Sequence, residues 1–182
     1  MKRIISLALV AALAFSFVAC GGSTSTSGQS TKDYAAIISS SRDQEMNDAF
    51  NIFTLKDGVF GSTGGYSEDL SEDEIKTQAE LSLDMLGIEA EDVQDAAYSV
   101  SLMNVKAYGV AIVKPVSGKT EAVKQALSTF IEAQKSAQEN YLADQYAIAK
   151  AAKLSVLKSG EVILVMCSGQ DTVYNSIESA LK

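Results

Sequence analysis

The sequence predicts an α+β protein in which an antiparallel sheet of about four strands carries helices on one face. Apolar runs with the periodicity of strands recur near residues 98–112 and 154–167, and apolar residues at helical spacing follow each of them. From residue 97 the expected order is strand, strand, helix, strand, strand, helix. Two such strand-strand-helix units form a layered α+β sheet, and an N-terminal helical region precedes them.

The N-terminal region predicts a short helix, a brief strand and a loop. Asp33 precedes an apolar helical pattern and is expected to cap a helix, whereas residues 39–48 are polar and ambiguous. Residues 51–55 predict a brief strand that ends at residues 56–58. Residues 61–66, which read GSTGGY, are expected to form a loop.

The next helix has clear start and stop signals. Ser71 and Glu74 have the spacing of a capping box, and apolar residues then recur at helical spacing. Gly87 fits the left-handed position after the helix, with Ile88 placed to contact the preceding turn. Residues 89–95 are expected to form one further turn.

Two hairpins complete the predicted sheet. The first strand includes Tyr98 and Val100, a turn follows at residues 104–106, and the second strand ends at Pro115. Small residues on one face of the second strand, which are expected to allow close approach of a helix, are Ala107, Gly109 and Ala111. The second hairpin is expected to turn at Ser159-Gly160 before a continuously apolar central strand at residues 162–167.

Two helical segments follow the hairpins. Residues 120–141 predict the longest helix, and residues 143–150 either continue it or restart near Leu142. Asp171 is expected to cap a last helix.

The first thirty-two residues predict export and anchoring. Residues 1–19 have a basic start, an apolar run and a small residue before Cys20, which is the pattern of a signal peptide. Phe17-Val18-Ala19-Cys20 resembles the lipobox of bacterial lipoproteins, which implies that Cys20 is the acylated residue. Residues 20–32 are rich in Gly, Ser and Thr and predict a flexible tether. Residues 33–182 are then a single domain on the extracytoplasmic face of the cell membrane.

Composition narrows the function. The chain has a net charge of −8 and scattered bases, which argues against nucleic acid as a partner. It contains no histidine, which excludes Ser/His/Asp and Cys/His nucleophile pairs and removes the commonest ligand of transition metals. Cys167 ends an apolar strand and is expected to pack in the core. We therefore expect no enzymatic activity and no cofactor.

Three groups of residues are weak candidates for a site. Acidic residues that crowd one stretch without the spacing of a known calcium loop are Glu68, Asp69, Glu72 and Asp73. Their alternative role is to stabilise a helix N-terminus. Lys119, at another helix N-terminus, either meets an anion or is simply solvated. Tyrosines that either line a groove or bury their rings are Tyr98, Tyr108, Tyr141 and Tyr146.

Several blocks together carry a family resemblance. They are LDMLGIEAEDV at residues 83–93, YSVSLMNVKAYGVAIVKP at residues 98–115, the GKTEAVKQAL helix start, and QENYLADQY at residues 138–146. With the lipobox, they resemble an uncharacterised family of Gram-positive lipoproteins known only as a domain of unknown function. The resemblance implies a lipid-anchored surface protein, and it brings no established activity, ligand or catalytic residue to transfer.

The function that we expect is a non-catalytic binding or interaction module, anchored to the membrane by its lipid, whose partner is an envelope protein or a small ligand. The alternative is a small-molecule or cation-binding receptor that assists envelope transport or sensing. A hydrolase with paired carboxylates ranks last, because the acids lie on predicted helix surfaces and loops.

Overall fold

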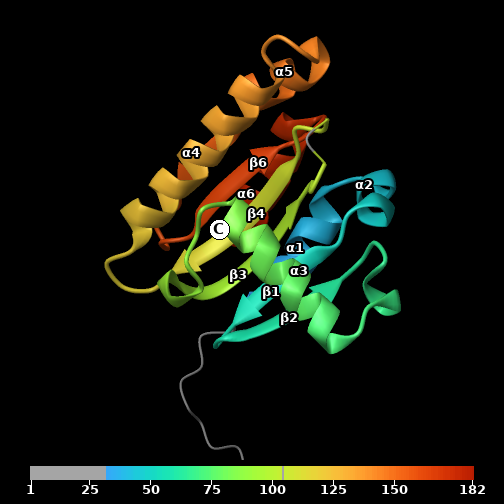
Figure 1. Cartoon of the computed structure of the whole chain (residues 1–182). Helices are drawn as coiled ribbons and strands as arrows, with labels where there is room; N and C mark the ends of the chain where they lie inside the picture. The colour runs from blue at the N-terminus through green and yellow to red at the C-terminus, as the bar shows by residue number, and fades with distance from the viewer. Residues whose placement is uncertain (1–31, 104) are drawn as a thin grey trace, which may run out of the picture. The chain divides into compact units, whose positions relative to one another are not determined.

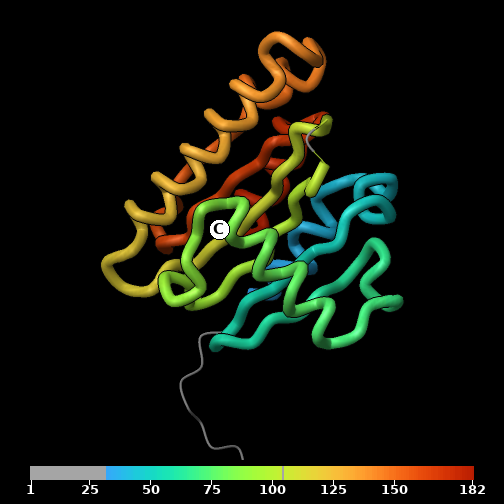
Figure 2. Tube along the Cα trace, viewed as in Figure 1, coloured from blue at the N-terminus to red at the C-terminus, as the bar shows by residue number. Residues whose placement is uncertain are grey.

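A computed structural model of the chain describes residues 32–103 and 105–182. A six-stranded antiparallel sheet in the order β2-β1-β3-β4-β6-β5 lies between helices (Figures 1 and 2). The strands are β1 (Ile52–Lys56), β2 (Val59–Thr63), β3 (Val93–Val100), β4 (Gly109–Pro115), β5 (Lys153–Val156) and β6 (Val162–Met166). The helices are α1 (Tyr34–Ser41), α2 (Gln44–Ala49), α3 (Glu72–Met85), α4 (Thr120–Gln138), α5 (Ala143–Lys150) and α6 (Gln170–Leu181), with 3-10 turns at Ser67–Asp69 and Ala90–Asp92. The signal peptide, Cys20 and nearly all of the tether lie outside the described residues.

The sheet has six strands, so the expectation of about four was wrong. The two additional strands are β1, expected only as a brief strand, and β2, of which residues 61–63 were expected to be loop. Asp57 and Gly58 both have positive φ, which is the conformation of a two-residue hairpin turn. β2 is an edge strand without fully buried residues, and therefore lacks the alternation that identifies half-buried strands.

Helices cover both faces of the sheet, which corrects the prediction of a single covered face. α3, α4 and α5 contribute to one core cluster, and α1 and α6 contribute to the other. Successive residues of β4 alternate between the two clusters: Ala111 and Val113 face the first, and Val110 and Ile112 face the second. Double coverage explains why β6 is continuously apolar, since both of its faces are buried.

The elements of the two strand-strand-helix units follow one another in the expected order, but the helices of the two units do not occupy equivalent positions on the sheet. A two-fold axis that exchanges antiparallel β4 and β6 within a sheet keeps each face of the sheet on its own side. α4 packs on one face and α6 on the other, so no such axis relates the units. The weak sequence echo between them is therefore not a symmetric repeat.

The predicted starts of α1 and α3 and the predicted end of α3 are confirmed. Each depends on hydrogen bonds between residues that are close in the sequence. The Asp33 carboxylate accepts a hydrogen bond from the Ala36 N–H at 3.0 Å and caps α1. Ser71 and Glu74 form the capping box of α3. Gly87 has a φ of +71°, and the following N–H reaches back to the carbonyl of Leu83. Short-range patterns therefore position α1 and α3 correctly.

Other boundaries differ from expectation. β3 begins at Val93, so the expected turn at residues 89–95 shortens to Ala90–Asp92. Gly169, with a φ of +67°, occupies the cap of α6, and Asp171 lies inside the first turn. The Asp171 carboxylate instead pairs with Lys153 at 2.8 Å. Of the two alternatives for residues 143–150, the structure has the restart, because α5 begins after Leu142.

Small residues of β4 do allow a close helix approach. A Cβ on Gly109 would lie 2.9 Å from Cε1 of Phe130 in α4, which is too close unless the Phe130 ring shifts. This contact brings α4 down onto the sheet at the start of β4. Among the described helices, none combines the length and the apolar character that crossing a membrane requires.

The two ends of the sheet carry different features. At one end, called the loop end, residues 101–108 connect β3 to β4, and α2 and α5 flank this connection (Figure 1). At the other, called the Lys32 end, the start of α1 meets the turn before β6, because the Tyr34 hydroxyl donates to Glu161 at 3.1 Å. Lys32 also donates to the carbonyl of Leu181, at the end of α6, and therefore lies at this same end.

Candidate functional site

The candidate site is a cleft of about 640 Å³ at the loop end of the sheet. α2 forms one wall, α5 forms another, and the segments before β4 and after β6 lie between them. Its lining comprises Asp43, Glu45, Met46, Ala49, Phe50, Lys106, Ala107, Tyr108, Asp144, Gln145, Ala147, Ile148, Cys167 and Ser168. The cleft is therefore assembled from four segments that are distant in the sequence.

Two stacked aromatic rings form the floor. The ring centroids of Phe50 and Tyr108 lie 4.0 Å apart, and the ring planes differ by 9°. Phe50 follows the last turn of α2, and Tyr108 immediately precedes β4. The stack therefore joins the N-terminal helices to the centre of the sheet.

A buried arginine supports this floor. Arg42 donates to the Ser99 hydroxyl at 2.9 Å, to the Phe50 carbonyl at 2.7 Å and to the Tyr108 hydroxyl. Its Nε donates to Asn47 at 2.6 Å. Within the described part of the chain it forms no ion pair, so its charge is met by neutral acceptors alone. No motif in the sequence points to Arg42, although it is the one arginine beyond the predicted signal peptide.

Titratable groups of the floor stay neutral. Burial raises the pKa of Tyr108, although the Arg42 charge acts in the opposite direction. Burial, with the nearby Asp43 charge, raises the pKa of Cys167 to about 11. The thiol is 2 % exposed and packs among the apolar residues of the second core, as expected. A protonated, buried thiol is a poor nucleophile.

Charged side chains surround the opening. Asp43 and Glu45 belong to the α2 wall and Asp144 to the α5 wall, and all three are exposed. The ammonium of Lys106 lies 5.1 Å from the centroid of the Phe50 ring. In residues 32–103 and 105–182, none of these four groups is in an ion pair.

Large apolar side chains are exposed beside the cleft. Leu102, Met103 and Val105, in the segment that joins β3 to β4, are 43 %, 58 % and 52 % exposed. The same segment contributes Lys106, Ala107 and Tyr108 to the cleft lining. The apolar residues therefore lie next to the cleft along the chain, and the two together are here called the loop-end surface.

The acidic residues singled out in the sequence are not part of this site. Glu68 and Asp69 lie on a 3-10 turn, Glu72 and Asp73 lie in the first turn of α3, and all four are exposed. The described part of the chain contains no group of three or more His, Cys, Asp or Glu side chains that could hold a metal ion. Cys20 lies outside the described residues.

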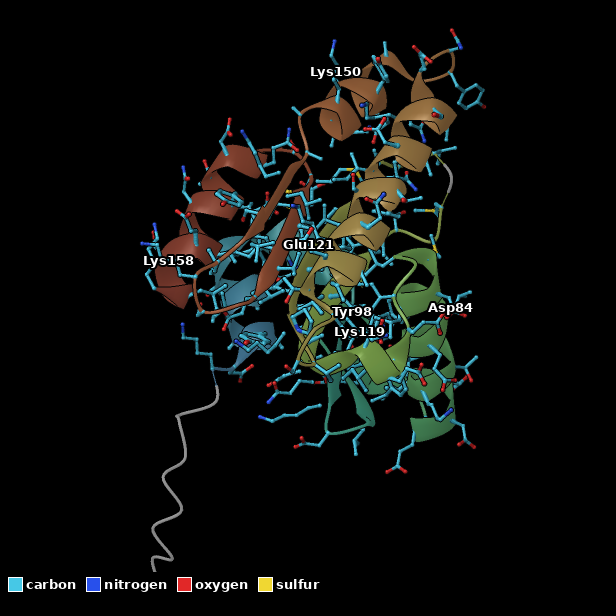
Figure 3. All side chains as sticks on the ribbon, turned by 90° about the vertical axis from the view of Figure 1, so that its left-hand side faces the viewer. Asp84, Tyr98, Lys119, Glu121, Lys150 and Lys158 are labelled. Carbon is cyan, nitrogen blue, oxygen red and sulfur yellow. The ribbon has the colours of Figure 1, made fainter. Side chains whose placement is uncertain are left out.

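Lys119 and Tyr98 each have an assignable partner, and the other candidate tyrosines differ in burial. The Lys119 ammonium, before the start of α4, pairs with Asp92 at 2.7 Å (Figure 3). The buried Tyr98 hydroxyl donates to the Ala79 carbonyl at 2.9 Å, and burial raises its pKa. Tyr141 is 74 % exposed, and of the four tyrosines only Tyr108 lines the cleft.

Comparison with known proteins identifies the family of the chain but assigns no activity to it. Residues 66–168 match the family described as "Domain of unknown function (DUF4358)", which spans α3 to β6 and thus includes Tyr108, α5 and Cys167. α2 and Phe50 lie before the matched region. No curated protein and no solved structure matches the chain. Because the match covers more than half of the sequence, the chain belongs to the DUF4358 family.

Proposed function

We propose that this protein is a lipid-anchored binding module on the extracytoplasmic face of the cell membrane, and that it binds its partner through the loop-end surface without catalysis. The observation that carries the proposal is the exposure of Leu102, Met103 and Val105 next to a 640 Å³ cleft. Contiguous exposed apolar side chains are typical of interaction sites, because isolated domains gain nothing from leaving them in water.

The position of this surface suits a tethered protein. The predicted tether joins the domain at Lys32, at the end of the sheet opposite the loop-end surface. β4 has seven residues, which span about 20 Å between the two ends at roughly 3.3 Å per residue. A domain anchored through Cys20 would therefore keep its loop-end surface clear of its own attachment point.

The chemistry of the lining supports binding rather than catalysis. The chain has no histidine to serve as a general base. The Cys167 thiol is buried and protonated, and the three lining carboxylates are exposed to water. A general acid or base is usually tuned by burial or by a close charged partner, and these carboxylates have neither.

A small-molecule receptor that assists envelope transport or sensing is the second candidate. The cleft volume favours it, since pockets for small ligands typically measure about 300–1,000 Å³. Both functions place the ligand at the same surface, and they differ in whether the partner is a protein.

Site-specific photo-crosslinking in intact cells tests the proposal. A photoreactive residue at position 103 is expected to capture a discrete partner, whereas one at position 59, an exposed apolar site at the opposite end of the sheet, is not. Cys20→Ala is expected to release the chain from the membrane fraction. Equal capture from both positions would contradict a binding role for the loop-end surface, and membrane retention of a cleaved Cys20→Ala chain would contradict lipid anchoring.

A further inference from the structure

We infer that the loop-end cleft binds an organic cation, meaning an ammonium or guanidinium group carried on an apolar body, against the face of the Phe50 ring that Tyr108 does not cover. This inference rests on the proposed function, because it names the ligand class for the same cleft. Three features carry it: an aromatic ring that already meets a cation, carboxylates on two walls, and apolar lining.

The ring geometry is that of a cation–π site. Tyr108 stacks on one face of Phe50, and the ammonium of Lys106 lies 5.1 Å from the ring centroid. A cation within about 6 Å of a ring centroid is attracted by the negative face of the ring. The protein therefore places its own cation where a ligand cation would bind.

Lys106 is a replaceable occupant of this position. Its side chain is exposed and, within the described residues, forms no ion pair that would hold it in place. A lysine carries its charge on a flexible four-carbon stem, so it can move into water at small cost. A ligand ammonium would take over the ring contact while Lys106 turns outward.

Carboxylates stand on two walls of the cleft. Asp43 and Glu45 extend from the α2 side and Asp144 extends from α5, so a cation between the walls is attracted from both sides. Two positive charges oppose it, those of Lys106 and Arg42. Arg42 is buried behind Tyr108 with its N–H groups directed to neutral acceptors, and the three carboxylates outnumber the two cations.

Apolar side chains complete the cleft. Met46 of α2 and Ala147 and Ile148 of α5 line it together with the aromatic floor. These residues accommodate a hydrocarbon or aromatic body next to the charge. A small inorganic cation would leave this lining in water, so the cleft favours an organic one.

The test uses residues 32–182, which contain both hydrophobic cores and so fold without the preceding segment. The ¹⁵N-labelled domain is titrated with three probes of one shape and different charge: 2-phenylethylamine, 2-phenylethanol and 3-phenylpropanoate. We expect the amine to shift the amide signals of Lys106, Ala107 and Tyr108, with at least about fivefold tighter binding than the other two probes.

Substitutions distinguish the effect of a carboxylate in the cleft from the effect of the net charge of the domain. Asp144→Asn is expected to weaken amine binding about threefold, because one wall loses its carboxylate. Asp84→Asn removes the same charge from an exposed position on α3, outside the cleft lining, and is the matched control (Figure 3). Lys106→Met is expected to tighten amine binding about twofold, because it removes the competing cation.

Each other outcome has a distinct meaning. Equal binding of the alcohol and the amine at the cleft, or preferred binding of the carboxylate, would overturn the cation inference and leave the cleft as a binding site. The same weakening by Asp84→Asn and Asp144→Asn would also overturn it. If no probe shifts the cleft signals, the cation inference fails, whereas the proposed binding function is decided separately by crosslinking from position 103.

Discussion

The cluster around Glu161 at the Lys32 end and the cleft at the loop end differ in how their charged side chains are paired. At the Lys32 end, the buried Glu161 carboxylate accepts a hydrogen bond from Tyr34, and Lys114 lies 3.9 Å from it. The ion pairs Lys56–Asp95 and Lys119–Asp92 also lie toward this end, next to the turns at the start of β3 and the end of β4. At the loop end, Arg42 meets only neutral acceptors and the carboxylates around the cleft meet no cation within the described residues.

This difference is consistent with a structural role for the Glu161 cluster and with the binding role proposed for the loop-end surface. At the Lys32 end, burial opposes ionisation of Glu161, yet hydrogen bonds from Ser159 and the backbone, with the Lys114 charge, hold its pKa below the ordinary value. Tyr34 responds oppositely, since burial and the neighbouring carboxylate raise its pKa. These charges are compensated within the fold. Those around the cleft have no charged partner among the described residues.

The largest expected effect concerns the support of the cleft floor. Arg42→Ala removes the donor to four buried or half-buried acceptors and should lower the free energy of unfolding by about 3 kcal/mol. Lys114→Ala, at the opposite end, removes a half-exposed partner and should cost about 1 kcal/mol. Urea unfolding of residues 32–182 measures both. A larger loss from Lys114→Ala would mean that Lys114 contributes more to the stability of the fold than Arg42 does.

The next effect tests how tightly α4 packs against the start of β4 at the loop end. Gly109→Ala places a methyl group 2.9 Å from Phe130 and should cost about 2 kcal/mol through overpacking. Phe130→Leu makes room, so the double variant should be more stable than the sum of the two single losses predicts. Thermal unfolding of the four proteins measures this coupling. Additive losses would mean that the contact between α4 and β4 is loose.

A pH dependence distinguishes the Lys32 end. Because the pKa of Glu161 is lowered in the folded state, its contribution to stability is present above the ordinary glutamate pKa and is lost as the pH falls through the folded value. Glu161→Gln should therefore cost about 1 kcal/mol near pH 7, and the difference from the parent should shrink toward about pH 3. Urea titrations across this range measure it. Glu121→Gln, at an exposed position, is the control, and an equal pH dependence for both variants would refute the role of Glu161.

The smallest stability effect is expected at the loop-end surface. Replacing Leu102 and Met103 together by Ser should change the free energy of unfolding by no more than about 0.5 kcal/mol, because both side chains are largely in water. Unfolding in urea checks this, with crosslinking from position 105 as the functional readout. A loss above about 1 kcal/mol would show that these residues pack into the fold and are not reserved for a partner.

Much of the fold could be predicted because the signals were local. The capping box of α3, the turn at Gly87 and the order of elements after residue 97 depend on neighbours in the sequence, and all were correct. The site could not be predicted in the same way. Its floor joins Phe50 to Tyr108, its support is a single arginine among polar residues, and no spacing in the sequence links them.

The sequence by itself determined the starts of α1 and α3, the hairpin turn at Ser159-Gly160 and the apolar strands of the core, because each depends on hydrogen bonds and periodicity within a few residues. Only the tertiary structure decided that helices cover both faces, that β2 extends the sheet, and that α2 and α5 enclose a cleft. Those features depend on long-range packing. A face of the sheet is covered or left open according to which distant segment packs on it. The local sequence of that segment shows only that it is apolar, and does not specify the face against which it packs.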